Sequence, residues 1–226
     1  AEDAFYELRK RRGVTRTEAK RQIRRRIYFG AMMCRLGKAD GLIAGLTMYY
    51  PETIRPCLEV IGTRKGVKKV CGVYTMVLKN RVLFFSDTTM NIEPTGEELA
   101  EIAMLTSDLV KDTFNMEPKV AMLSFSSFGS VDHPLVRKVQ KAVEIVKATR
   151  PELKCDGEMQ ADTALVPLIR ERVLPSSTLK DMANVLIFPN LDAANISYQF
   201  AKVMADALPV GPILIGTAKP AHILTG

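Results

Sequence analysis

The feature that most constrains the fold is a series of short apolar runs separated by segments with helical spacing. The runs VCGVYTMVL, VLFFSD, VAMLSF, VLIFP and ILIG occupy residues 70–78, 82–87, 120–125, 185–189 and 213–216. Their β-branched and aromatic residues are typical of strands, and the first two, separated by Lys79-Asn80-Arg81, predict a hairpin. Strands that alternate with helices favour a largely parallel sheet covered by helices, so the sequence predicts an α/β fold.

Two of the intervening segments carry clear helix start signals. Thr95 and Glu98 form a capping-box pattern after Pro94. Pro134 opens a second helix, which should end at Arg150. Further helices are expected after residue 162 and from near residue 195. The apolar stripes predicted to face the core are Leu99, Ile102, Leu105 and Leu109 in the first helix, and Leu135, Val139, Val143 and Val146 in the second.

The basic residues are concentrated at one end of the chain. The formal net charge of the 226 residues is +7, and residues 1–38 hold 12 Lys and Arg against 4 Asp and Glu. Apolar residues at helical spacing predict one helix from Thr15 to about Leu36, ended by Gly37. Its basic face can be solvated or face another subunit, bind a small anion, or contact nucleic acid. No helix-turn-helix, zinc-finger, RRM or KH pattern supports the last alternative.

The cysteines and histidines give no sign of a metal centre. Cys34, Cys57, Cys71 and Cys155 are widely spaced, which is typical of reduced, buried thiols rather than of a disulfide framework or a zinc site. His133 and His222 are expected to be structural, His133 at a helix start. Because no run is long and apolar enough for a signal peptide or a membrane span, we expect a cytoplasmic location.

Polar residues at the strand ends suggest a ligand site, because ligands of open α/β sheets bind at the carboxyl ends of strands. Residues 124–130 (SFSSFGS) offer hydroxyls and backbone N–H groups for a phosphate, or form an ordinary turn. Asp192 and Asn195 follow the run at 185–189 and can equally cap a helix. Lys219 follows the last run. Asp87 either faces a cleft or caps a turn.

These stretches, taken in order, resemble the phosphate acetyl/butyryl transferase family. The matching segments are ADG with Gly45, TIRP (53–56), SDT (86–88), MLSFSSFGS (122–130), CDGEMQAD (155–162), ANVLIFPNLDAANISY (183–198) and GPILIGTAKP (211–220). Several details are similar to the version of this domain at the C-terminus of large NADP-dependent malic enzymes, among them EMQAD (158–162) and KPAHIL (219–224).

The resemblance implies two α/β/α subdomains with a cleft between them, as in phosphotransacetylases and isocitrate dehydrogenases. The first would comprise residues 1–65 and 217–226, and the second residues 66–216. The resemblance also implies a homodimer or a higher homo-oligomer. No membrane is expected as a partner. Because family members have more sequence at both ends, we expect a segment of a longer enzyme.

Carried over residue by residue, the resemblance implies an active site in which some family residues are retained and others are replaced. Arg9 and Arg55 match arginines of the transferase site. Thr225 stands at the family's serine, whereas Gly226 and Val203 stand where the family has arginines, and Phe128 replaces a lysine. The residues expected to bind ligand are Arg9, Arg55, Asp87, Ser124, Ser126, Ser127, Gly129, Asn195 and Lys219.

The lost arginines favour a degenerate domain that binds acetyl-CoA or CoA and regulates malate oxidation allosterically. NADP and a divalent metal would then belong to the malic-enzyme part that this sequence lacks, because no dinucleotide or metal-carboxylate motif is present here. The alternative is an active phosphate acetyltransferase, which moves acetyl between phosphate and CoA.

Overall fold

The computed structural model describes residues 1–224 and divides the chain into two compact units. Unit 1 comprises Ala1–Lys68 and Gly216–Gly226, and unit 2 comprises Lys69–Ile215. The position predicted for the family serine, Thr225, lies outside the described residues. Each unit has its own core and is described by itself.

Unit 1 is mainly helical. Its helices are α1 (Glu2–Arg9), α2 (Arg16–Ile23), α3 (Arg26–Arg35) and α4 (Tyr50–Val60), with a 3-10 turn at Lys10–Arg12. The core of this unit includes an edge-to-face contact between Phe5 and Tyr28, whose ring centroids are 5.4 Å apart. Such pairs stabilise beyond their buried area, which fixes α1 against α3.

The prediction of one continuous helix from residue 15 to residue 36 is wrong. The chain breaks at Arg24 and Arg25, where Arg25 is extended (φ −73°, ψ 129°) and α3 begins. The apolar spacing missed the break because Ile23 and Ile27 are buried in both arrangements. The predicted ends are confirmed: the Thr15 hydroxyl accepts the Glu18 N–H at α2, and α3 stops just before residue 37.

Two short strands complete unit 1. Strand β1 (Leu42–Gly45) pairs in parallel with β8 (Ala221–Leu224), which brings the last described residues beside the middle of the unit. Gly45 has φ +116°, and a Cβ there would lie 2.0 Å from the Leu224 carbonyl oxygen. Only glycine permits this approach of the two backbones.

Unit 2 is built on a six-stranded sheet in the order β5-β4-β6-β3-β2-β7. Its strands are β2 (Cys71–Leu78), β3 (Arg81–Ser86), β4 (Lys119–Leu123), β5 (Lys154–Met159), β6 (Val185–Ile187) and β7 (Leu208–Ile215). The four neighbours from β5 to β3 run parallel, while β2 is antiparallel to both β3 and β7. The predicted β2–β3 hairpin and the largely parallel α/β sheet are thus confirmed.

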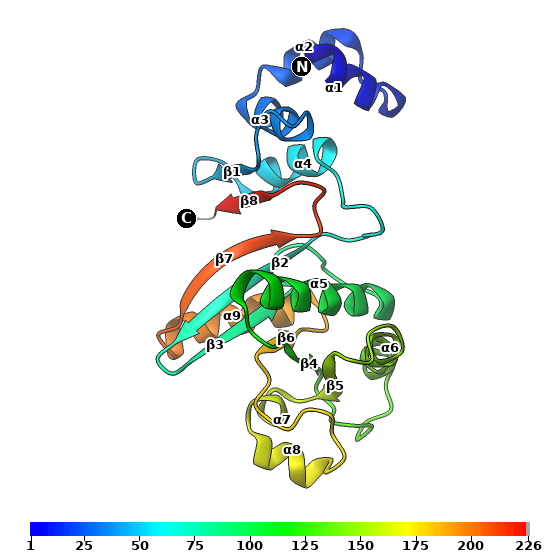
Figure 1. Ribbon diagram of the computed structural model, residues 1–226, viewed down its shortest axis with the longest axis vertical. Coiled ribbons are helices and arrows are strands. Elements are labelled where there is room, and N and C mark those ends of the chain that lie inside the picture. Colours follow the sequence, from blue (N-terminus) through cyan, green and yellow to red (C-terminus); the bar gives the residue numbers. More distant parts are fainter. Residues whose placement is uncertain (225–226) are drawn as a thin grey trace. The chain divides into compact units, whose positions relative to one another are not determined.

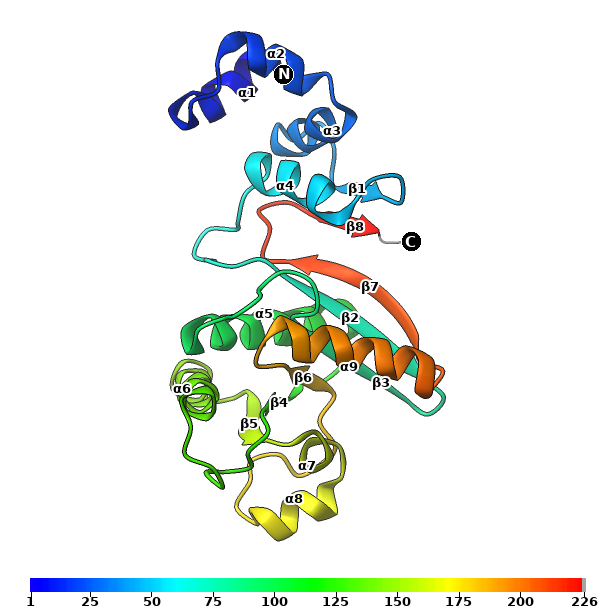
Figure 2. The same cartoon turned by 180° about the vertical axis from the view of Figure 1, so that it is seen from behind.

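Helices cover both faces of this sheet. Helix α5 (Gly96–Phe114) lies on one face beside α6 (Pro134–Thr149), and α9 (Leu191–Met204) lies on the other (Figures 1 and 2). The short helices α7 (Ala161–Leu165) and α8 (Pro167–Val173) follow β5. The predicted capping box is confirmed, because Thr95 and Glu98 exchange side-chain and backbone hydrogen bonds at the start of α5.

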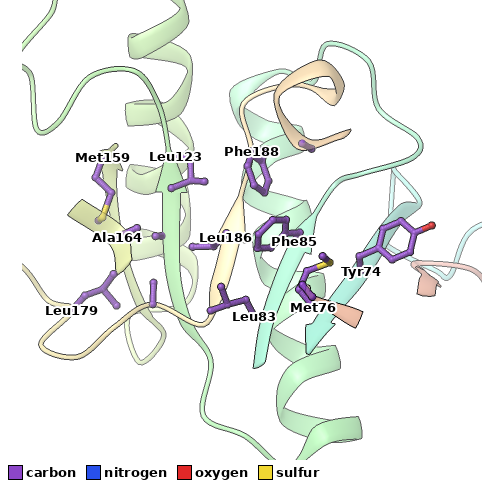
Figure 3. Packing of buried hydrophobic residues seen from close by; sticks show 14 residues of the cluster. Tyr74, Met76, Leu83, Phe85, Leu123, Met159, Ala164, Leu179, Leu186 and Phe188 are labelled. Atoms are coloured by element: carbon purple, nitrogen blue, oxygen red, sulfur yellow. The ribbon is translucent and has the colours of Figure 1, made fainter. Parts of the chain in front are cut away.

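The core on the α9 side joins side chains from several strands. Leu83, Phe85, Leu186, Phe188 and Leu123 extend across β3, β6 and β4 (Figure 3). The Phe85 and Phe188 rings lie 5.2 Å apart. This packing holds the neighbouring carboxyl ends of the parallel strands in fixed positions.

The predicted stripes are mostly correct. Leu99, Ile102, Leu105, Val139, Val143 and Val146 are buried, but Leu135 is 44% exposed and Leu109 is half-buried. Val136 and Val110 take the inward positions. In α6, residue 135 lies in the first turn, and the buried face begins with Val136.

Other boundaries also differ from prediction. Strand β4 ends at Leu123 rather than Phe125, and α9 begins at Leu191 rather than near residue 195. Asn190 caps α9 by accepting the Ala193 N–H at 2.9 Å. Strand β5 was not predicted, because only Cys155 and Met159 of its sequence KCDGEM are apolar.

All four cysteines are buried and free, as predicted. Burial raises the pKa of the Cys57 thiol to about 11 and that of Cys155 to about 12, so both are inert thiols at neutral pH. No helix among residues 1–224 is long and apolar enough to cross a membrane.

Candidate functional site

The carboxyl ends of four parallel strands meet at one edge of the unit 2 sheet. The chain leaves them at Ser86, Leu123, Met159 and Ile187. Hydrogen bonds tie the segments beyond these ends to one another: Ser124 N–H donates to the Met159 carbonyl at 2.9 Å, and Phe188 N–H to the Ser86 carbonyl at 2.8 Å. The polar segments that the sequence singled out in unit 2 therefore share one edge.

The serine-rich loop after β4 satisfies its own backbone. Every N–H from residue 126 to residue 131 donates to a neighbouring oxygen. The acceptors are, in order, Ser124 Oγ, Ser130 Oγ, the Glu158 carbonyl, Glu158 Oε1, the Ser127 carbonyl and Ser126 Oγ. The predicted cradle of free N–H groups is therefore absent from the described loop.

Glu158, at the end of β5, organises this loop. Its side chain is only 1% exposed, and its Oε1 accepts the Ser126 hydroxyl at 2.8 Å and the Gly129 N–H at 2.7 Å. Phe128 has a left-handed φ of +50°, which is uncommon for a bulky residue, and its N–H is held by the Glu158 carbonyl. Sequence reasoning quoted Glu158 within a motif but gave it no role.

Asp87 caps the loop after β3. It is 4% exposed, and its Oδ1 accepts the N–H groups of Gly72 at 2.8 Å and Thr89 at 3.1 Å. Its Oδ2 accepts the N–H of Asn91 at 2.8 Å. Burial raises the pKa of Asp87 and these hydrogen bonds oppose the rise. The structure thus favours the turn-capping alternative for this carboxylate.

Asn195 lies on the exposed side of α9, one turn from its start. Its Nδ2 donates to the Thr88 carbonyl at 3.4 Å, which links α9 to the loop that Asp87 caps. Asp192 lies in the first turn of the same helix, where a negative charge is favourable, but Asn190 is the cap. Val203, at the position of a family arginine, is 72% exposed.

Unit 1 contains a basic pocket of about 510 Å³. Four arginines line it, Arg9, Arg12, Arg25 and Arg55, together with the carboxylates Glu18, Glu52 and Glu59. They come from α1, the 3-10 turn, the break before α3, and α4. Sequence reasoning named Arg9 and Arg55 but missed Arg12 and Arg25, because the predicted continuous helix placed Arg25 on a solvated face. We call this the arginine pocket.

Arg9 and Arg55 differ in their freedom. Arg9 Nη2 lies 3.3 Å from Glu59 Oε1, and Arg9 Nε is buried without a hydrogen-bond partner in the described structure. Glu59 also accepts the Tyr28 hydroxyl at 2.8 Å; burial and this carboxylate raise the pKa of Tyr28 to about 12. Arg55 is exposed, so an incoming anion can reach it directly.

Three other predicted residues lie elsewhere. Lys219 is exposed in unit 1 just before β8, near enough to Cys34 for its charge to act on that thiol. His133 caps α6, with Nδ1 accepting the Leu135 N–H at 3.2 Å, as predicted. His222 is half-buried on β8, and burial lowers its pKa. Within residues 1–224, no group of three or more His, Cys, Asp and Glu side chains is arranged to hold a metal ion.

The comparisons with known proteins decide the family. The model of the family described as phosphate acetyl/butaryl transferase matches residues 1–226. The chain belongs to this family. It is 42% identical to the phosphate acetyltransferase of Thermoanaerobacterium thermosaccharolyticum over 98% of this chain and 69% of the relative. It is also 42% identical to the NADP-dependent malic enzyme of Escherichia coli, over 98% of this chain but only 29% of that enzyme.

A solved structure gives the same result. The phosphotransacetylase of Streptococcus pyogenes superposes with a TM-score of 0.94 at 38% identity, over 99% of this chain and 68% of that one. The predicted family and the α/β fold class are therefore confirmed, whereas the two α/β/α subdomains with a cleft between them stay a prediction. The comparisons do not support oxidoreductase activity in this chain, since the acyltransferase relatives match it over most of their length. The expectation of a degenerate domain likewise gains no support from them.

Proposed function

We propose that this chain is an acyltransferase that moves an acetyl group between phosphate and the thiol of CoA. In the forward direction the sulfur attacks the acetyl carbon, a C–S bond forms, and the bond between carbon and the phosphate oxygen breaks. Phosphate departs with the electron pair of that bond, and the proton released by the thiol ends on the departing phosphate. The family and the 42% identity to a phosphate acetyltransferase over 69% of its length support this proposal.

The observation that carries the proposal is the arginine pocket. CoA and acetyl phosphate are both anions, and arginine binds phosphate through bidentate, charge-assisted hydrogen bonds. We assign the phosphate groups of CoA to Arg55 and Arg9, the two arginines that match the family's site. Arg9 Nε is a buried donor without a partner, so an anion there would satisfy it.

In unit 2 we assign the acyl phosphate to the edge formed by the strand ends. Ser124, Ser127 and Gly129 lie there, as does the Asp87 loop to which Asn195 is tied. A site on strand ends is rigid, which suits a reaction that depends on positioning and on stabilising charge in the transition state.

A second candidate is a domain that binds acetyl-CoA without transferring acetyl. Val203 and Phe128 in place of family cations favour it. This domain would bind acetyl-CoA through the same arginine pocket. The two candidates differ in turnover and not in binding.

The test measures CoA binding by calorimetry and acetyl-CoA formation by thioester absorbance, on the same protein. Arg55→Ala should lower kcat/KM for CoA by roughly tenfold to a hundredfold, the loss expected for one charge-assisted contact. Arg64→Ala, another exposed arginine of unit 1 outside the pocket, is the matched control and should change it little. Tight acetyl-CoA binding without turnover would instead establish the second candidate.

We also infer a homo-oligomer. Ile196, Phe200, Val203 and Met204 recur at helical spacing on α9 and are 54–78% exposed, which is unusual for a helix that faces only water. Sedimentation of the wild type and of Phe200→Asp would show whether this face takes part in association. A monomeric wild type would contradict the inference.

A further inference from the structure

The hydroxyl groups of the serine loop form a chain with a defined direction. Ser126 Oγ lies 2.8 Å from Glu158 Oε1 and 3.1 Å from Ser130 Oγ, and it accepts the Val131 N–H at 3.2 Å. The distance between the two serine hydroxyls alone does not say which is the donor. Glu158 resolves this ambiguity.

An N–H group can only donate, so Glu158 Oε1, which receives the Gly129 N–H, acts as an acceptor. The Ser126 hydroxyl must therefore give its single proton to Glu158. Ser126 then has only lone pairs to offer Ser130, and the Ser130 hydroxyl becomes the donor in that pair. The protons of both hydroxyls point inward, toward Glu158, and neither can be donated to a ligand.

Ser124 and Ser127 enter the same network differently. Ser124 Oγ accepts the Ser126 N–H at 3.3 Å, and Ser127 Oγ accepts the Gln160 N–H at 3.1 Å. Their own protons lie outside the chain that ends on Glu158. Ser127 is 8% exposed, whereas Ser124 is half-buried at the carboxyl end of β4, where a ligand can reach it.

We infer that Glu158 is a positioning residue for the acyl phosphate. It orients the hydroxyl protons of Ser126 and Ser130 inward, and it holds the loop so that the Ser124 hydroxyl donates to a phosphoryl oxygen of the acyl phosphate. The inference rests on the proposed function and extends it to a residue that never touches substrate. Without Glu158, the Ser126 proton loses its acceptor and is free to turn. The Gly129 N–H loses its acceptor as well, whereas the Phe128 N–H keeps the backbone carbonyl of residue 158.

The test compares Glu158→Ala, Glu158→Gln and Ser124→Ala with a matched control. Asp156→Ala is that control: Asp156 lies on the same strand, is 3% exposed, and accepts the Ser177 hydroxyl at 2.7 Å and the Thr178 N–H at 2.9 Å. Asp156 thus holds the loop that contains Ser177 and Thr178, and not the serine loop. An effect seen in both Glu158→Ala and Asp156→Ala reflects a general loss of stability. An effect seen only in Glu158→Ala reflects the serine loop.

We expect Glu158→Ala and Ser124→Ala to raise KM for acetyl phosphate by about tenfold or more, with KM for CoA nearly unchanged. Glu158→Gln keeps an amide oxygen that accepts both donors and should restore most of the wild-type value. Asp156→Ala should lower the melting temperature and leave both KM values in place. Equal changes in the two KM values, or none, in Glu158→Ala would overturn the inference.

A readout without turnover separates this inference from the proposed function. Glu158→Ala should accelerate amide hydrogen exchange at Gly129, whose N–H loses its side-chain acceptor, whereas Asp156→Ala should not. If the wild type transfers no acetyl group, the proposed function fails and the exchange result still judges the role of Glu158. Unchanged protection of the Gly129 amide in Glu158→Ala would refute that role.

Discussion

Arg170 gives the sharpest test of the packing in unit 2. It is 1% exposed, yet among residues 1–224 no carboxylate is hydrogen-bonded to it. Its guanidinium instead donates to backbone carbonyls: Leu179 at 3.1 Å, Thr163 at 2.9 Å, Ala164 at 3.0 Å, and Asp181. Arg170 therefore joins α7, α8 and the segment that leads to β6.

Arg170→Leu keeps much of the side-chain volume but removes these donors. The Ala164 carbonyl still accepts the Ala183 N–H at 3.1 Å, so the other three carbonyls lose most. A buried polar group left without a partner costs about 1–3 kcal/mol, so the free energy of unfolding should fall by about 3–5 kcal/mol. Arg170→Lys should recover only part of this loss, because a single ammonium cannot reach all of the carbonyls.

Chemical denaturation with urea measures the effect. Arg172→Leu, on the exposed side of the same helix, is the control and should change stability by no more than about 0.5 kcal/mol. An Arg170→Leu protein within about 1 kcal/mol of the wild type would refute the claim that this buried cation fastens the segment.

Further predictions concern a helix cap, a buried carboxylate and the arginine pocket. Thr95→Ala should cost about 1 kcal/mol of unfolding free energy, because the bond from the Glu98 N–H is lost; a loss below about 0.3 kcal/mol in denaturant would argue against the cap. Burial acts to raise the pKa of Asp156, but Lys147 and hydrogen bonds outweigh it and the pKa lies below 3.8. The ionised Asp156 carboxylate therefore stabilises the fold above pH 3.8, and this stabilisation is lost as the pH falls through its lowered pKa. Asp156→Asn should accordingly lower the melting temperature at neutral pH but not in strong acid. Added salt should weaken CoA binding, and Arg55→Ala should reduce that dependence in calorimetry; an unchanged salt slope would count against the pocket.

Elements with a strong local signal were predictable from the sequence. The hairpin before α5, the capping box at Thr95 and the cap at His133 each depend on residues within a few positions of one another. The family motifs, in order along the chain, indicated the α/β fold. Most of the fold of unit 2 could thus be predicted from local sequence signals and from the order of the family motifs.

Features that depend on distant partners were not predictable in this way. The break before α3 falls between Ile23 and Ile27, which are buried on two separate helices, and the polar sequence of β5 is a strand that pairs with β4. The conformation of the serine loop depends on hydrogen bonds to Glu158, which lies 28 residues or more away in the chain and adjacent in space. From its hydroxyls and N–H groups, the loop could be either a phosphate cradle or an ordinary turn, and in the structure the Glu158 carboxylate accepts the Ser126 hydroxyl and the Gly129 N–H.

The arginine pocket shows the same limit. The sequence indicated Arg9 and Arg55 only through the family resemblance, and the net charge of the basic end did not distinguish a ligand site from a solvated face. The structure brings Arg12 and Arg25 to the same pocket, because the chain turns between α1 and α2 and again between α2 and α3.

The central claim is that this chain transfers acetyl groups and does not merely bind them. The most direct measurement mixes the protein with acetyl phosphate and CoA and quantifies acetyl-CoA and released phosphate together. The account predicts that both products appear at many turnovers per protein, in equal amounts, and that neither appears when CoA is omitted. Bound acetyl-CoA without sustained formation of either product would contradict it.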